Sequence, residues 1–199
     1  MAAHPRAAYF AGYGALHLAV AEQIYLRSDE FRALEEQRVV HIENAAGLLA
    51  VYCPGKRIVQ LRAHNTALAQ IARGSVLSLR VMPGSARLLD GNSAQSFQTI
   101  PTAALFWHYG QACLAALDQL PELASQSLHV KRFPALDPSI LLLRQLHLIH
   151  VLSHHGPSFE QLLPLLHEEA RAFVCPDLAS LHLTGSLCIG KSESPPLAR

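Results

Sequence analysis

Residues 133–189 read FPALDPSILLLRQLHLIHVLSHHGPSFEQLLPLLHEEARAFVCPDLASLHLTGSLCI. This stretch contains the start and stop signals of three short helices, followed by a small apolar strand. Asp137 and Pro138 provide an N-cap and a proline at the first helical position, and Gly156 provides a C-terminal stop. The sequence therefore predicts a first helix over residues 139–155.

Two further helices are marked by the same kinds of local signal. Ser158 and Gln161 have the spacing of a capping box, which opens the second helix. A proline and an aspartate open the third helix, predicted over residues 176–184, and Gly185 ends it. The apolar run after Gly185 predicts a strand at residues 187–189.

This order of elements predicts a winged-helix-like unit over residues 135–190. In a DNA-binding winged helix the third helix normally enters the major groove, but residues 172–190 contain no Lys or Arg. With so few phosphate contacts available, we expect no measurable binding to duplex DNA at physiological salt, and we expect a protein partner instead. The residues predicted to meet that partner are the apolar side chains of the third helix, Leu178, Leu181 and Leu183. If DNA were the ligand, the residues expected to contact it are Arg144, Arg171 and Lys191.

Composition and charge limit the possible classes of protein. The chain has 199 residues, of which half are hydrophobic, so one large or two small domains can bury a core. A net charge of +1 excludes the strongly basic balance that drives non-specific nucleic-acid affinity. The four cysteines are scattered and form no C-x-x-C pair, which predicts reduced thiols and a cytoplasmic location. The apolar run in residues 1–20 is interrupted by Pro5, Gly12 and Gly14 and makes a poor signal-peptide core, and no run of about 18 apolar residues follows, so we expect neither export nor membrane spanning.

The first 120 residues predict an α+β domain, with an antiparallel sheet and flanking helices. A helix is expected over residues 15–33, and a long apolar helix from residue 101 to about residue 120. Short β-branched and aliphatic runs separated by turns predict the strands; these strands are expected at residues 39–42, 48–52, 58–61, 76–81, 87–89 and 96–100. A short helix is expected at residues 65–73, a connector at residues 121–134 and a disordered tail at residues 191–199.

Residues 47–63, GLLAVYCPGKRIVQLRA, contain two glycines that each lead into an apolar strand. This stretch resembles the strand, glycine turn, strand signature of bacterial PATAN domains; the matching residues are Gly47, Tyr52, Gly55, Ile58 and Val59. The similarity continues at residues 67–69, at Val76, and at residues 99–101 and 117–118. In that family a small winged-helix-like unit often follows, and residues 137–189 would correspond to it. The resemblance implies a non-enzymatic signalling adaptor that binds other proteins in bacterial motility and response-regulator pathways.

Two sequence patterns suggest a ligand, one a metal ion and the other a nucleotide, and for each we favour an interpretation without that ligand. His147, His150 and His154 lie on one side of the first predicted helix and could in principle ligate a metal, with His155 beside them. We favour a solvated helix face, without settling whether these histidines bind metal. The string GSLCIGKS places Gly185, Gly190, Lys191 and Ser192 at the fixed positions of a P-loop. Because no helix and no nucleotide-binding domain follow it, we favour a chance match.

No combination of nucleophile, base and orienting group emerges from the sequence. We therefore expect no catalytic residue, no metal and no cofactor. The leading hypothesis is a protein-interaction adaptor, the second is a DNA-binding regulator, and the third is a nucleotide-dependent or metal-dependent enzyme. The sequence indicates neither the partner nor the oligomeric state.

Overall fold

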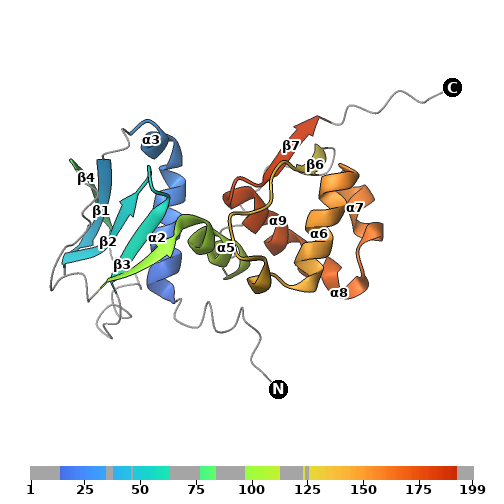
Figure 1. The fold of residues 1–199 in the computed structure, drawn as a ribbon, viewed down its shortest axis with the longest axis horizontal. Helices are drawn as coiled ribbons and strands as arrows, with labels where there is room; N and C mark the ends of the chain where they lie inside the picture. Colours follow the sequence, from blue (N-terminus) through green and yellow to red (C-terminus); the bar gives the residue numbers. More distant parts are fainter. Residues whose placement is uncertain are drawn as a thin grey trace, which may run out of the picture. The chain divides into compact units, whose positions relative to one another are not determined.

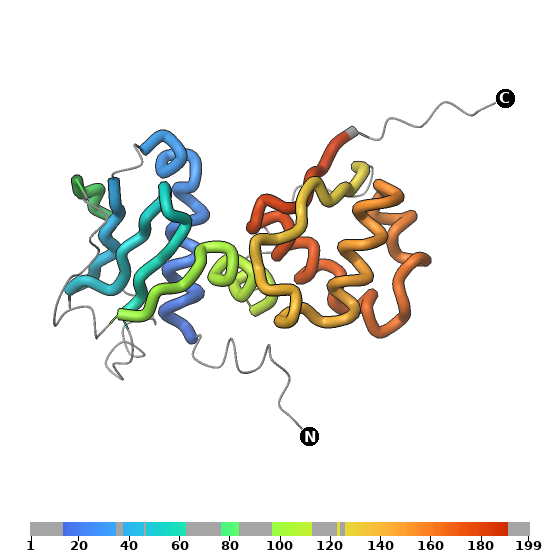
Figure 2. Tube along the Cα trace, viewed as in Figure 1, coloured from blue at the N-terminus to red at the C-terminus, as the bar shows by residue number. Residues whose placement is uncertain are grey.

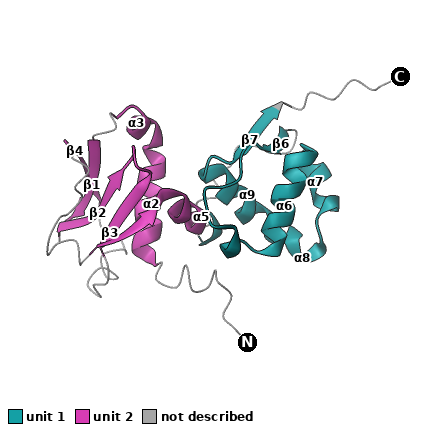
Figure 3. Cartoon of the chain, viewed as in Figure 1, with its two compact units in different colours: residues 1–11, 110–199 teal, residues 12–109 magenta. Residues whose placement is uncertain are grey.

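The computed structural model describes residues 14–34, 38–45, 47–62, 77–83, 97–112, 123 and 126–191. The chain divides into two compact units (Figure 3). We call Gly12–Tyr109 the sheet unit, and Gly110–Arg199 together with Met1–Ala11 the helical unit. The division falls within helix α5 (Thr102–Ala112), eleven residues before the predicted end of the first domain at residue 120.

The sheet unit is built on a five-stranded antiparallel sheet in the order β4-β1-β2-β3-β5 (Figure 1). Its strands are β1 (Arg38–Asn44), β2 (Gly47–Cys53), β3 (Ile58–Arg62), β4 (Ser78–Pro83) and β5 (Phe97–Pro101). The predicted meander of the first three strands is confirmed, as is the α+β class. The helix expected at residues 65–73 and the strand expected at residues 87–89 lie outside the described residues.

Both faces of this sheet are apolar. Along one face Val40, Tyr52, Val59 and Ile100 lie opposite one another across four strands, and Phe31 of helix α3 packs edge-on against Tyr52 with ring centroids 5.6 Å apart. On the other face a separate buried cluster forms; its members are Val39, Val51 and Cys53, with Leu48, Ile58 and Met82 packed against them. Burial on both faces explains why the central strand β2, GLLAVYC, is almost continuously apolar, whereas most residues of β4 and β5 are exposed or half-buried.

The helix expected at residues 15–33 is two helices, α2 (Ala15–Leu26) and α3 (Ser28–Arg32). Arg27 separates them with a non-helical backbone, so that α3 can place Phe31 against the sheet while α2 buries Val20 and Ile24. The helix expected from residue 101 begins at Thr102 as α5 and is described as far as Ala112. Its predicted continuation to residue 120 lies outside the described residues.

The helical unit combines a two-stranded sheet with a group of short helices. Its elements are β6 (Gln126–Val130), the 3-10 turn η3 (Pro138–Ile140), α6 (Leu143–His154), α7 (Phe159–Leu165), α8 (Glu168–Arg171), α9 (Val174–Leu183) and β7 (Leu187–Lys191). Figure 2 shows β6 and β7 side by side although all the helices of this group separate them along the chain. The strand β6 lies where the sequence predicted only a connector. The winged-helix assignment stays a prediction.

The helix-start signal at Asp137 forms in the structure, but tertiary packing shortens the helix that follows it. Asp137 does cap the Ser139 N–H, at 2.9 Å, and this bond lowers the pKa of Asp137. However, the turn that follows is only a short 3-10 turn, because the chain extends at Leu141 to bury that side chain. The predicted helix over residues 139–155 is therefore wrong in its first turn, and α6 begins at Leu143.

The signals at Gly156 and Ser158 are confirmed, whereas the third helix begins earlier than predicted. Gly156 has a positive φ of 54° after α6, and the capping box of Ser158 and Gln161 forms as predicted. The third long helix, α9, begins at Val174 instead of Pro176. Asp177, which the sequence suggested as part of a helix start, is buried inside α9.

His17 of α2 gives the sheet unit a pH dependence. Its Nδ1 accepts a hydrogen bond from the Gly14 N–H, at 3.1 Å, so this nitrogen must be deprotonated for the bond to form. Burial and the neighbouring His108 lower the pKa of His17 from 6.5 to about 4. Since the unfolded chain takes up this proton first, the stabilisation is complete above about pH 6.5 and is lost as the pH falls towards 4.

We expect the urea midpoint of the wild-type protein to fall between pH 7 and pH 5, and to fall less in His17→Gln, which has no titrating ring. A pKa change of one unit corresponds to about 1.4 kcal/mol, and partial solvent exposure reduces the whole effect to about 1–2 kcal/mol. Urea denaturation at both pH values measures it. Equal pH dependence in the two proteins would contradict this role for His17.

Candidate interaction surface

The side chains predicted to meet a partner are buried. Leu178 and Leu181 have 0% exposed surface and Leu183 has 6%, so all three belong to the core of the helical unit. The predicted docking surface on these three leucines is therefore wrong, because buried side chains are not accessible to a partner.

A polar network lies within the helical unit, centred on α9. Asp177 is buried there, with 3% of its side chain exposed. Its Oδ1 accepts hydrogen bonds from Gln111 Nε2 at 2.8 Å and from Gln145 Nε2 at 2.7 Å. Its Oδ2 accepts from Arg144 Nε at 3.1 Å. Gln111 Nε2 also donates to Ser180 Oγ, at 3.0 Å. The network thus ties the last turn of α5 and the first turn of α6 to α9.

Arg144 passes from this network to the surface. While its Nε pairs with Asp177, its guanidinium carbon lies 4.3 Å from the centre of the Phe173 ring. A cation held over an aromatic face gains further attraction. The buried carboxylate therefore fixes the position of an arginine, and the arginine in turn fixes an aromatic side chain that is 48% exposed.

Three exposed apolar side chains belong to the elements joined here, at the start of α6, at the end of α7 and just before α9. Leu143, at the start of α6, is 83% exposed, Phe173 is 48% exposed and Leu165, at the end of α7, is 47% exposed. Arg144, next to Leu143, stacks on Phe173. One turn after Leu143, His147 Nε2 lies 3.3 Å from the Leu165 carbonyl oxygen. We call Leu143, Leu165 and Phe173 the apolar patch.

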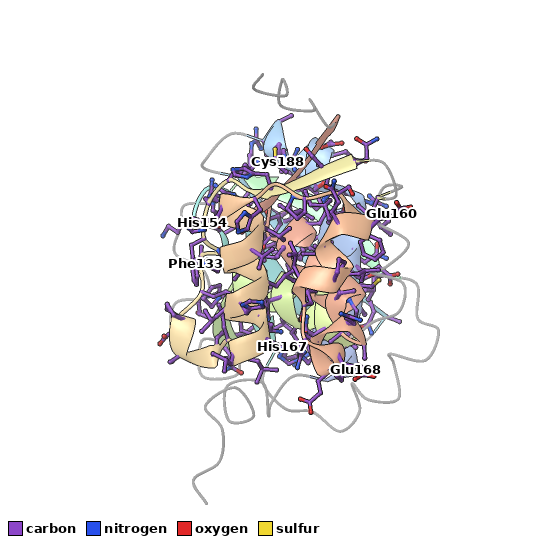
Figure 4. All side chains as sticks on the ribbon, turned by 90° about the vertical axis from the view of Figure 1, so that its right-hand side faces the viewer. Phe133, His154, Glu160, His167, Glu168 and Cys188 are labelled. Carbon is purple, nitrogen blue, oxygen red and sulfur yellow. The ribbon has the colours of Figure 1, made fainter. Side chains whose placement is uncertain are left out.

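The edge of the apolar patch is polar. His167 faces His147 with ring centroids 5.7 Å apart, and Arg171 Nε donates to the Leu166 carbonyl oxygen at 3.1 Å. Figure 4 shows His167 and Glu168 at this end of the helical unit. An apolar centre with a polar rim is the usual composition of a protein-binding surface.

The residues predicted to contact DNA do not form one surface for phosphate. Arg144 is paired with Asp177 and stacked on Phe173, so its charge is already compensated. Arg171 is exposed but follows Glu168 and Glu169, which are also exposed. Lys191 ends β7, and its side chain lies outside the described residues.

The P-loop string does not have the conformation of a P-loop. Its interior, Leu187–Lys191, is the extended strand β7, which pairs with β6 in a register that places Gly190 opposite Ser127. A P-loop instead needs a compact loop whose backbone N–H groups converge on phosphate. Gly185 has a positive φ of 67°, as expected for the turn after a helix, and Ser192 lies outside the described residues.

The histidines of α6 form two pairs instead of one row. His147 faces His167, while the rings of His150 and His154 lie 4.3 Å apart. In the described parts of the chain no three His, Cys, Asp or Glu side chains are close enough to hold a metal ion together. The sequence could not show this division, because His167 comes from a different helix.

Comparison of the chain with protein-family models, curated proteins and solved structures found no match. None of the helices in the described ranges combines the length and apolar character needed to cross a bilayer.

Sequence reasoning missed both the polar network and the apolar patch. Gln111 and Asp177 are 66 residues apart in the chain, and no local pattern connects them. One signal was available for the patch: Leu143 and Phe173 each stand next to an apolar residue that is more deeply buried in the structure. Only tertiary packing decides which of the two neighbours is exposed.

Proposed function

We propose that this protein is a non-enzymatic adaptor that binds another protein through the apolar patch, in bacterial cytoplasmic signalling or motility control. The observation that carries the proposal is the exposure of Leu143, Leu165 and Phe173 on the helical unit. Arg144, which the buried Asp177 carboxylate holds in place, lies over the Phe173 ring. Large apolar side chains left exposed beside charged and polar groups are typical of protein-binding surfaces.

The likeness of residues 47–63 to the PATAN signature supports the signalling part of the proposal. That signature consists of a glycine, a strand, a glycine turn and a second strand. Here Gly47 has a positive φ of 111°, and β2 and β3 flank a turn closed by a hydrogen bond from the Arg57 N–H to the Pro54 carbonyl oxygen, at 3.1 Å. This arrangement of glycine, strand, turn and strand supports the proposal.

We expect Leu143→Glu to abolish partner binding without changing stability. Leu143 is mostly exposed, so the substitution removes little packing, while a carboxylate at the centre of a buried interface costs several kcal/mol. Affinity capture from the native cell with the wild-type chain identifies the partner. Binding of that purified partner, measured by calorimetry, should weaken by about 100-fold or more in the variant.

Leu26→Glu is the matched control, because Leu26 is also an exposed leucine, at 58%, but lies in the sheet unit. The control should bind like the wild type. Equal binding by both variants would contradict a role for the apolar patch. Tight binding to duplex DNA that weakens steeply with salt would favour the regulator hypothesis over the adaptor.

A further inference from the structure

The last two turns of α6 carry two exposed histidines four residues apart, His150 and His154. Residues with this spacing lie one above the other on the same side of a helix. Their rings are 4.3 Å apart between centroids, with an angle of 41° between the ring planes. Figure 4 shows His154 at the opposite end of the unit from His167, so this pair is separate from the apolar patch.

The tautomer of His154 is fixed by its hydrogen bond. His154 Nδ1 lies 2.9 Å from the His150 carbonyl oxygen. Since a carbonyl oxygen can only accept, Nδ1 of the neutral ring carries the proton and Nε2 keeps its lone pair. Histidines that ligate metals characteristically donate the other ring N–H to a backbone carbonyl or a carboxylate in this manner.

The position of the pair on the helix also favours a cation. His154 is the last residue of α6, and His155 is its C-cap. The carbonyl groups at the C-terminal end of a helix give it a partial negative charge, which attracts cations within the last turn. Both imidazoles are exposed, so neighbouring side chains leave room for their rings to turn and place one nitrogen each on a shared ion, at the usual distance of about 2.0–2.1 Å.

We propose that His150 and His154 form a two-histidine site for a divalent transition-metal ion, of the class of Cu²⁺, Ni²⁺ and Zn²⁺. Imidazole nitrogen is a preferred ligand of these ions and a poor one for Mg²⁺ and Ca²⁺. Water fills the remaining coordination positions. The usual order of affinities predicts that Cu²⁺ binds more tightly than Ni²⁺.

The test uses the full chain without a histidine tag and isothermal titration with Cu²⁺, Ni²⁺, Zn²⁺ and Mg²⁺. We expect the tightest binding event to involve one transition-metal ion per chain and to be at least about tenfold weaker in His150→Gln and in His154→Gln, since even outer-sphere changes weaken metal sites by 10–100-fold. We expect no binding of Mg²⁺. Circular dichroism of each variant checks that the fold is kept.

His155→Gln is the matched control, because His155 is also exposed and adjacent, but its ring lies 6.5 Å from that of His154. This variant should bind like the wild type. A second readout is Ni²⁺-induced broadening of histidine ring signals in NMR spectra, expected at His150 and His154 first. Unchanged affinity in the two pair variants, equal loss in His155→Gln, or one ion per two chains would overturn the proposal.

Discussion

Replacing Gly110 by alanine is expected to destabilise the helical unit, although alanine is the better helix former. A Cβ at this position of α5 would lie 2.5 Å from Ser180 Oγ and 2.7 Å from both Ser180 Cα and Ser180 N. Two of these three atoms belong to the backbone of α9, so no side-chain rotation can relieve the overlap. The two helices must separate or shift.

Two opposing effects decide the size of the change. Alanine in place of glycine inside a helix gains about 1 kcal/mol from intrinsic propensity, whereas forcing an extra carbon into a close-packed contact costs about 1–3 kcal/mol and more when backbone must move. Because Ser180 is fully buried and its Oγ already bonds the Pro176 carbonyl oxygen, we expect the overlap to dominate. Gly110→Val should be more destabilising still.

Urea denaturation of Gly110→Ala measures the effect. Gly190→Ala is the control in the same unit, because a Cβ there meets only Ser127 Oγ at an ordinary 3.9 Å. The control is expected to be as stable as the wild type. If Gly110→Ala were instead more stable than the wild type, α5 and α9 would not be in contact at this glycine.

The sequence predicts the strands of the sheet unit well, because their signals are local. The turn at Pro54 and the aliphatic and β-branched runs on either side define β2 and β3 without reference to the rest of the chain. Gly156 and the capping box of Ser158 and Gln161 were predictable for the same reason. Their physical causes, a positive φ and orphan backbone N–H groups, act within a few residues.

Prediction failed where tertiary packing outweighed a local preference. Asp137 and Pro138 began a helix as expected, but burial of Leu141 ended it after one 3-10 turn. The apolar side of α9 was correctly predicted as apolar, yet the sequence could not show whether that side faces a partner or the core of the same unit. Leu178, Leu181 and Leu183 are all buried, so packing in the core is sufficient to explain why this side of α9 is apolar.

Asp177 is the clearest case in which tertiary packing overrides a local sequence signal. Its replacement is also expected to have the second large effect on stability. An aspartate near a proline at a helix start is usually an exposed capping residue. Here its carboxylate is buried and accepts hydrogen bonds from Gln111, Gln145 and Arg144. Removing it takes away the only negative charge opposite the Arg144 guanidinium in this network and one acceptor from each of the two amides, which keep bonds to Ser180 Oγ and to Gln111 Oε1.

We therefore expect Asp177→Ala to destabilise the helical unit by about 3–5 kcal/mol, the usual cost of breaking a buried ion pair from one side. Since typical domains have only about 5–15 kcal/mol of stability, the variant should unfold at a much lower urea concentration. Asp29→Ala is the control: Asp29 also pairs with an arginine, Arg32, at 3.2 Å, but both side chains are exposed. Little change is expected there.

A double-mutant cycle then separates the ion pair from the rest of the network. If Arg144 and Asp177 stabilise each other, Arg144→Ala and Asp177→Ala together should cost less than the sum of the two single changes, by about 0.5–3 kcal/mol. Because Asp177 fixes Arg144 and Arg144 stacks on Phe173, the conservative change Asp177→Asn should also weaken partner binding through the apolar patch, in protein that is still folded. Additive costs in the cycle, with unaltered partner binding by Asp177→Asn, would show that the buried network and the exposed surface are independent.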